Sequence, residues 1–278
     1  MNLGDTSVQI VTDGTLLMDG GAVFGQVPKP IWETSVKSDR RNRVRLGLNC
    51  LLIQMPNTNI LVDTGAGSKR MDRLKDAYGL IGNKLLRELK KHSLTPREID
   101  IVLLSHLHFD HAGGCTKLDR SGNIVPTFPN ADYMVQTSAL EEALSPNERS
   151  RSAFIRDDFQ PLHDKGMIKL LQGDTEIAPG VQVKQTDGHS NGHQVVLIEG
   201  GSERIAYLAD LIPTAYHLAL PYIAALDQTP NDTLNQKKEI LEMAINGGWL
   251  LVFGHGLDQK AGYVEERKGR LSLLPVDM

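Results

Sequence analysis

Short apolar runs bounded by turn residues recur along this chain and predict β-strands. They occupy residues 8–11, 48–54, 60–63, 101–105 and 249–253. Runs of this length are typical of strands buried in a sheet. Two more runs, at 193–199 and 204–208, flank Gly200-Gly201-Ser202, and this arrangement predicts a β-hairpin.

Two segments carry apolar residues at helical spacing. Residues 79–91 place Ile81, Leu85 and Leu89 four apart, which predicts one buried helix face. Residues 232–246 predict a second helix, with Gly247 expected just past its end. Its apolar face is formed by Ile240, Leu241, Ala244 and Ile245. Residues 95–98 have capping-box spacing, with Pro96 at the first helical position, and predict a further short helical turn.

Two segments follow neither pattern and are expected to be irregular loops. Residues 19–43 contain several glycines and prolines and then a charged run, and residues 123–130 contain two prolines. Long ordered loops in compact domains often serve function. The 19–43 loop is expected to cover either a site or a partner subunit. No linker divides the chain, so we expect one domain over residues 1–278.

Composition narrows the class of protein. The chain has 278 residues, of which 40% are hydrophobic and 23% charged, as in ordinary globular proteins. The net charge of -4 does not favour a nucleic-acid-binding surface, and no apolar run is long enough for a transmembrane helix. The N-terminus lacks a signal-peptide pattern, so a cytoplasmic location is expected. Cys50 and Cys115 form no disulfide framework and are expected to be small buried residues.

The closest cluster of candidate functional side chains lies directly after the apolar run 101–105. Residues 106–111 read His-Leu-His-Phe-Asp-His. Imidazole and carboxylate groups are ligands for divalent metals of borderline softness. In an extended segment His106 and His108 project to the same side, and Asp110 and His111 face a second point as the chain turns. Four donors in six residues can thus serve two neighbouring ions. The alternative is a polar, solvated loop.

Further donors are expected from His189, Asp210 and His255. Each lies at the carboxyl end of a predicted strand, where open α/β layers present their sites. Taken alone, a histidine at such a position is more often an ordinary surface or core residue. Their order along the chain, after the 106–111 cluster, favours a shared site.

This pattern resembles the metallo-β-lactamase superfamily: His-x-His-x-Asp-His, then a histidine 78 residues on, an aspartate 21 further and a histidine 45 beyond. Residues 62–65, Val-Asp-Thr-Gly, match an early motif of that superfamily. The resemblance implies an α/β fold (α+β in some schemes), a four-layer αββα sandwich with a dinuclear site at one edge. Two divalent ions are implied, zinc first, with iron, manganese or cobalt as alternatives.

The resemblance also assigns the ligands. His106, His108 and His189 would hold the first metal, and Asp110, His111 and His255 the second. Asp210 would bridge both. Asp63 would orient ligands by hydrogen bonds, or close a tight turn before Gly65. His193 would orient a ligand, or simply begin a strand.

Within the superfamily, residues 18–32 and 209–217 resemble the quorum-quenching N-acyl homoserine lactonases. Phe24 and Trp32 would form an apolar wall for an acyl chain, or else anchor their loop on the core. Tyr216 or His217 would donate a hydrogen bond to the substrate. The chain departs from this subgroup at two positions, with Pro213 where some lactonases have tyrosine and with glycine, not an acidic residue, after His255.

The resemblance therefore implies a dinuclear metal-dependent hydrolase that opens lactones or small esters by attack of a metal-bridging hydroxide. Asp110 would orient the hydroxide and pass a proton to the leaving group. Two alternatives stay open, an organophosphate triester hydrolase and a metal-dependent ligand sensor without useful turnover. The expected partner is a small-molecule substrate, with no nucleic acid and no membrane. A homodimer is an open alternative.

Overall fold

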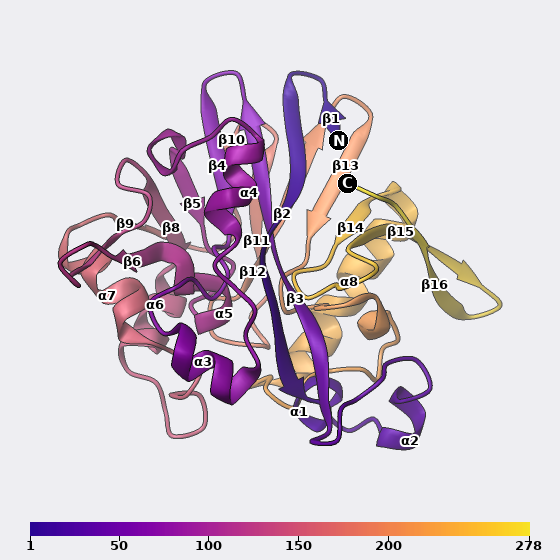
Figure 1. Ribbon diagram of the computed structural model, residues 1–278. Helices are drawn as coiled ribbons and strands as arrows, with labels where there is room; N and C mark the ends of the chain where they lie inside the picture. The colour runs from indigo at the N-terminus through magenta and orange to yellow at the C-terminus, as the bar shows by residue number, and fades with distance from the viewer.

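Two mixed β-sheets of seven strands each form the centre of the protein in this computed structural model, which describes residues 1–278 (Figure 1). The first sheet has, in spatial order, β1 (Asn2–Leu3), β2 (Thr6–Asp19), β3 (Arg43–Met55), β4 (Thr58–Val62), β5 (Ile101–Leu103), β8 (Asp132–Gln136) and β9 (Ile168–Leu171). The second has β10 (Thr175–Ala178), β11 (Val181–Gln185), β12 (Gln194–Gly200), β13 (Glu203–Tyr207), β14 (Leu250–Val252), β15 (Ala261–Arg267) and β16 (Arg270–Pro275). A separate small sheet pairs β6 (Thr116–Leu118) with β7 (Ile124–Pro126).

The inner faces of the two large sheets form one apolar core. Leu51, Val62 and Leu103 of the first sheet pack in the same buried cluster as Val196 and Val252 of the second. Their strands are short apolar runs that lose nearly all contact with water, and this burial stabilises the stack. The strands predicted at 8–11, 48–54, 60–63, 101–105 and 249–253 and the hairpin at 193–208 are all confirmed, with shifted ends.

Helices cover the outer faces of both sheets. The helices are α1 (Gly20–Phe24), α2 (Lys29–Trp32), α3 (Met71–Tyr78), α4 (Leu85–Lys91), α5 (Phe109–Ala112), α6 (Thr137–Leu144), α7 (Arg156–Asp164) and α8 (Pro230–Gly247), with 3-10 turns η1 (Pro96–Glu98), η2 (Gly113–Cys115) and η3 (Ala215–Leu218). Leu89 of α4, Leu140 of α6 and Phe159 of α7 pack on the first sheet. Leu241 of α8 packs on the second. The expected αββα sandwich is confirmed.

The helix predicted at 79–91 is wrong in its first half. Gly79 has a φ of 55° and ends α3, and Asn83 also has a positive φ, so no helix passes through these residues. Ile81 is half exposed and bridges to Thr15, whereas Leu85 is buried in α4 as expected. Spacing alone did not reveal this break.

The two predicted loops are partly regular. Residues 19–43 contain α1 and α2, and residues 123–130 contain β7. The second long helix extends one residue beyond the prediction, because Gly247 still belongs to α8 and Gly248, with a φ of 64°, ends it. At 95–98 the expected capping contact is present, with the Glu98 side chain accepting from the Thr95 N–H at 2.7 Å.

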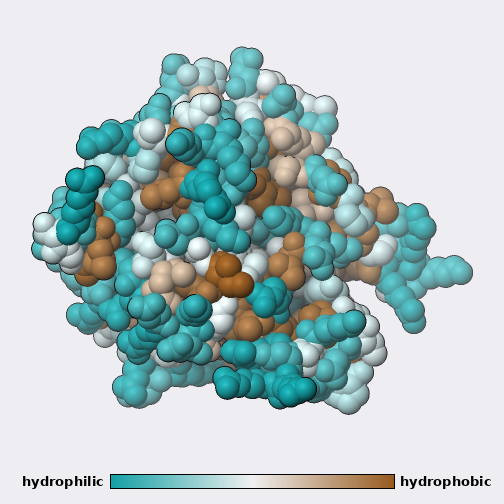
Figure 2. Space-filling view, in the orientation of Figure 1, coloured by the Kyte–Doolittle hydropathy of each residue, from teal (hydrophilic) through white to brown (hydrophobic).

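The β15–β16 hairpin projects from the second sheet, and its tip is hydrophilic (Figures 1 and 2). Arg267, Lys268 and Arg270 lie at this tip, and charge there opposes edge-to-edge pairing with other sheets. Cys50 and Cys115 are buried, as predicted, and they are not joined in a disulfide. None of the helices has the length and apolar character needed to span a bilayer.

Candidate metal centre

The predicted ligands come together from segments that follow β5, β11, β13 and β14. Strands β4, β5 and β8 run parallel in the first sheet, as do β13 and β14 in the second, so within each sheet their carboxyl ends lie on the same side. The segments that follow them carry most of the predicted ligands. All seven predicted ligands are buried there, namely His106, His108, Asp110, His111, His189, Asp210 and His255.

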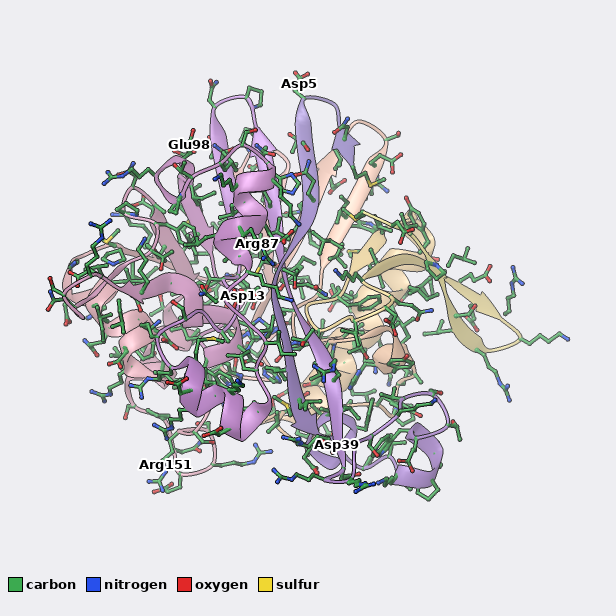
Figure 3. All side chains as sticks on the ribbon, in the orientation of Figure 1. Asp5, Asp13, Asp39, Arg87, Glu98 and Arg151 are labelled. Carbon is green, nitrogen blue, oxygen red and sulfur yellow. The ribbon has the colours of Figure 1, made fainter.

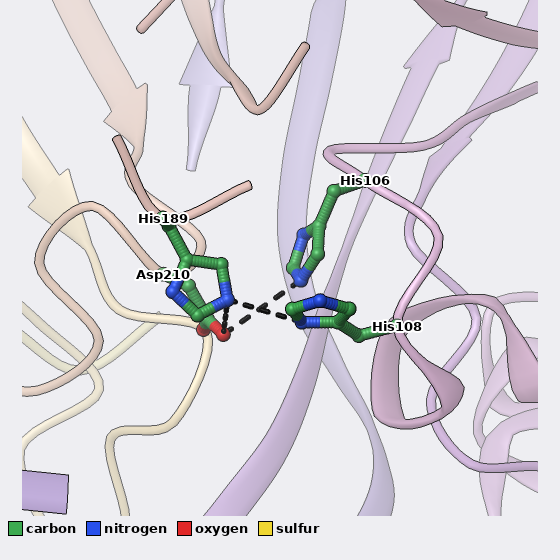
Figure 4. Close-up of side chains that lie close together, drawn as sticks. All are labelled: His106, His108, His189 and Asp210. Carbon is green, nitrogen blue, oxygen red and sulfur yellow. Dashed lines mark hydrogen bonds and ion pairs between the residues drawn. The ribbon is translucent and has the colours of Figure 1, made fainter. Parts of the chain in front are cut away.

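The first donor group contains His106, His108, His189 and Asp210 (Figure 4). His189 Nε2 lies 3.1 Å from Asp210 Oδ2 and 3.1 Å from His108 Nδ1. His106 Nε2 lies 3.8 Å from Asp210 Oδ2. Their ligand atoms all lie within 4.8 Å of one another, a spread that one ion can span.

The second donor group contains Asp110, His111 and His255. His255 Nε2 lies 3.2 Å from His111 Nε2 and 3.7 Å from Asp110 Oδ2. Asp210 lies between the groups, because its Oδ1 is 3.0 Å from His255 Nε2 while its Oδ2 faces His189. One carboxylate thus faces both donor groups.

Hydrogen bonds fix the rings of four histidines. Nδ1 of His111 donates to Asp63 Oδ2 at 2.8 Å, and Nδ1 of His255 donates to the Gly47 carbonyl at 2.8 Å. Nδ1 of His189 lies 2.8 Å from Asp227 Oδ1, and Nδ1 of His106 lies 3.0 Å from Ser105 Oγ. Each contact leaves Nε2 free to face the centre and fixes the tautomer that a metal requires.

Asp63 makes several contacts directly behind the predicted ligands. Its carboxylate accepts from His111, from the Ser105 N–H at 2.8 Å and from the Ser105 hydroxyl at 2.8 Å. The Tyr207 hydroxyl lies 2.9 Å from the same carboxylate. Asp63 is 1% exposed, and its φ of 58° directs it inward at the end of β4. The contacts favour the orienting role over the turn-closing one.

His193 acts on the backbone of Asp210. Its Nε2 accepts the Asp210 N–H at 3.2 Å, and its Nδ1 lies 2.7 Å from Thr186 Oγ1. Burial lowers the pKa of His193 to about 3, so the ring is neutral and Nε2 remains an acceptor. This contact positions the Asp210 backbone directly.

The arrangement fits cations. The Nε2 atoms of His111 and His255 lie 3.2 Å apart; burial alone would lower the pKa of both rings, but Asp210 raises it, so this position attracts positive charge. His106 Nε2 and Asp210 Oδ1 are buried without a hydrogen bond of good geometry. Burial alone would lower the pKa of His189, but Asp210 and Asp227 raise it to about 10, so this position attracts positive charge. Divalent metal ions would supply that charge and satisfy these atoms.

A cavity of about 120 Å³ opens onto both donor groups. His108, Asp110, His189, Asp210 and His255 reach its wall. Apolar side chains complete it: Met18, Val23 and Leu46 from the 18–46 region, Leu226 from the 224–226 segment, and Phe109 of α5. The 19–43 segment therefore borders the site within the same chain.

The four predicted substrate contacts, Phe24, Trp32, Tyr216 and His217, do not line the cavity at the donor groups. Phe24 and Trp32 are 1% and 2% exposed and stack on each other with ring centroids 5.0 Å apart, so they anchor α1 and α2 on the core. His217 is also buried, with Nδ1 2.8 Å from Thr214 Oγ1 and Nε2 donating to the Val23 carbonyl at 3.0 Å. Both of its nitrogens are occupied, which corrects its expected role as a substrate donor. Tyr216 is 38% exposed and lines a second cavity, of about 350 Å³, that also reaches Phe24 and His255.

The sequence analysis did not identify several residues that form hydrogen bonds with the predicted ligands or with Asp63. Asp227 lies in an irregular segment with no periodic pattern, and Ser105 and Tyr207 read as ordinary strand residues. Ser105 and Tyr207 could have been found only by their position near the ends of predicted strands, and Asp227 carried no such signal. Arg149 was also missed; its guanidinium donates to the carbonyls of Ala225 at 2.7 Å and Asp227 at 2.9 Å.

Comparisons with known proteins agree with this geometry. Residues 44–255 match the model of the metallo-beta-lactamase superfamily. An N-acyl homoserine lactonase from Bacillus cereus is 29% identical over 235 residues, which cover 80% of this chain and 86% of that protein. A probable metal-dependent hydrolase from Staphylococcus aureus has a similar structure, with a TM-score of 0.91, 29% identity and coverage of 100% and 99% of the two chains. AidC, a dizinc quorum-quenching lactonase solved with a product, shares the fold at 20% identity, with a TM-score of 0.83 and coverage of 100% and 97%.

Proposed function

This chain belongs to the metallo-beta-lactamase superfamily, and from that premise we propose that it is a dinuclear metallohydrolase that opens lactones or related small esters. Its relatives are metal-dependent lactonases, so the chain is assigned to the metal-dependent hydrolases. The finer assignment rests on one observation. Two buried donor groups face the same carboxylate, Asp210, and border one cavity.

We propose that each donor group holds one divalent ion. His106, His108 and His189 hold the first, and Asp110, His111 and His255 hold the second. Asp210, whose Oδ2 faces the first group and whose Oδ1 faces the second, would serve both ions. The mixture of imidazole and carboxylate donors suits zinc best. Bound there, divalent ions supply a hydrolytic nucleophile at neutral pH and polarise an ester carbonyl.

Asp110 is the proposed proton carrier. Its carboxylate lines the cavity and is almost completely buried. From that wall it accepts a proton from the attacking water and passes it to the leaving alkoxide. No serine or cysteine nucleophile is needed. The apolar wall formed by Met18, Val23 and Leu46 suits an acyl group beside the reacting ester.

The lactone class is supported by the curated relatives, which are N-acyl homoserine lactonases at 26–29% identity. We propose that this chain acts on the same class of small molecule. We also propose that residues 1–278 form one domain, because the two sheets share one apolar core. A cytoplasmic location and a homodimer remain predictions.

Purified protein of measured metal content tests this proposal. We expect two equivalents of metal per chain. We also expect the protein to open N-acyl homoserine lactones, which is measured as proton release, and a chelator to abolish this activity. An aryl phosphotriester assayed in parallel is expected to react far more slowly. Faster phosphotriester turnover would favour the organophosphate reading. Tight lactone binding without turnover in metal-loaded protein would favour a sensor.

A further inference from the structure

A basic groove lies beside the candidate active site. It has a volume of about 400 Å³ and is formed between α3 and the 151–157 segment. Phe109 and Ser152 line both this groove and the cavity at the donor groups, so the two spaces are adjacent and share a wall. An acyl chain that passes Phe109 from the centre would therefore enter the groove.

The wall nearest the centre is aromatic. Tyr78 packs against Phe109 with ring centroids 5.0 Å apart, and Phe154 packs against His108 at the same distance. All three aromatic rings line the groove. An acyl chain that leaves the donor groups would meet these rings first.

The wall of the groove also carries positive charge. Arg70, Arg73, Arg151 and Arg156 line the groove, and Asp157 is its single carboxylate. Asp157 pairs with Arg70, and Arg156 donates to the Leu144 carbonyl at 2.9 Å. This concentration of positive charge stands out on a chain whose net charge is -4.

Arg73 and Arg151 are both exposed, and their guanidinium groups make no ion pair or hydrogen bond within the chain. Both line the groove from different segments, Arg73 from α3 and Arg151 from the loop before α7, where Figure 3 labels it. A carboxylate between them would gain charge-assisted hydrogen bonds.

We propose that this groove binds the far end of the substrate, and that the preferred substrate is a lactone whose acyl chain ends in an anionic group. The chain lies along Phe109, Tyr78 and Phe154, and its terminal carboxylate meets Arg73 and Arg151. This inference rests on the proposed lactonase function and adds the chemistry of the acyl tail. Nothing in it changes the reaction at the ester.

Two matched substrates test the inference, N-octanoyl homoserine lactone and its analogue with a carboxylate in place of the terminal methyl group. In metal-loaded protein at low salt, we expect kcat/KM to be about three- to tenfold higher for the carboxylated lactone. Arg73→Gln and Arg151→Gln are each expected to lower this preference about two- to fivefold, mainly through KM. About 0.5 M salt should lower it as well, since exposed charges are screened.

Arg87→Gln is the matched control, because Arg87 is exposed on α4 and lies away from the groove (Figure 3). It should leave the preference unchanged. The double variant combines Arg73→Gln with Arg151→Gln. The inference would be overturned if the wild type preferred the neutral lactone, or if the double variant kept the wild-type preference. Either result would leave the lactonase function intact.

If neither lactone is opened, the proposed function fails while the groove can still be judged by binding. Calorimetry would compare octanedioate with octanoate on the metal-loaded protein. Tighter binding of octanedioate that is lost in the double variant supports the anionic subsite. Equal binding of the two acids, or binding that the double variant does not change, refutes it.

Discussion

Asp227 is the buried residue that contacts His189 of the first donor group from behind. Its Oδ1 lies 2.8 Å from His189 Nδ1, and the two side chains are 1% and 2% exposed. The backbone of this loop is bound to the His189 segment without the Asp227 side chain, because the Gln228 N–H donates to the Gly188 carbonyl at 2.9 Å. Replacing Asp227 with alanine therefore removes the partner of the ring while the loop stays attached.

The expected loss follows from the kind of contact. A hydrogen bond to a charged group contributes about 1.5–3 kcal/mol, and loss of a partner behind a ligating histidine costs about 10–100-fold in metal affinity. We expect Asp227→Ala to weaken one of the two metal-binding steps by that factor. Asp227→Asn keeps an oxygen acceptor and should cost less. The step that involves His111 and His255 should stay close to wild type.

Competition with a chromophoric chelator would measure both binding steps, and circular dichroism would check the fold. Asp232→Asn is the matched control, because Asp232 is exposed in the first turn of α8 and makes no ion pair. If folded Asp227→Ala bound both metals as tightly as the wild type does, the orienting role derived for Asp227 would be wrong.

Three further changes test other parts of the structure. Asp110→Asn should lower kcat for lactone opening by about 10²-fold or more in folded protein, since it removes the proton acceptor; stopped-flow proton release would measure this, and a wild-type kcat would exclude the role. Trp32→Ala should lower the free energy of unfolding by about 3–5 kcal/mol in urea denaturation, because the ring is buried in the core; a large rise in KM with little loss of stability would instead restore it as a substrate wall. Burial lowers the pKa of Lys237 from 10.5 to about 7. The unfolded chain therefore binds more protons than the native one between about pH 7 and 10, and this group makes the protein more stable as pH rises through that window. Lys237→Met should remove that rise, as urea denaturation at pH 7 and 9 would reveal.

Local patterns predicted the strands better than the loops between them. Strands such as β5 and β14 are continuous apolar runs, because they are buried on both faces and tolerate no polar residue. The helix was wrongly predicted over residues 79–84 because Ile81 lies at helical spacing from Leu85. In the structure Ile81 instead forms a β-bridge with Thr15. A long-range contact of this kind leaves no local signal. The short helices in residues 19–43 depend likewise on the contact between Phe24 and Trp32.

The predicted ligands come together because each follows a strand whose position the sheet order fixes. The residues behind them were harder to predict. Asp227 reaches His189 from a segment without regular structure, and Gly47 contributes only a backbone carbonyl to His255. A carbonyl carries no sequence signature. His217 was predicted from a motif position, but the motif could not reveal that Val23 already occupies its Nε2.

Backbone strain is concentrated around the same centre. Asp63, Asp187 and Ala209 have positive φ values of 58°, 46° and 44°, and each lies where a strand ends beside the donor groups. Such conformations cost on the order of 1 kcal/mol or more outside glycine, and they persist only where neighbouring contacts hold them. The carboxylate of Asp63 is held by His111 and Ser105, and Asp187 accepts the Gly192 N–H at 2.6 Å. After Ala209, the N–H of the next residue donates to His193. These contacts turn the chain sharply so that Asp210 faces both donor groups, and the strain is the cost of bringing the two groups to one carboxylate.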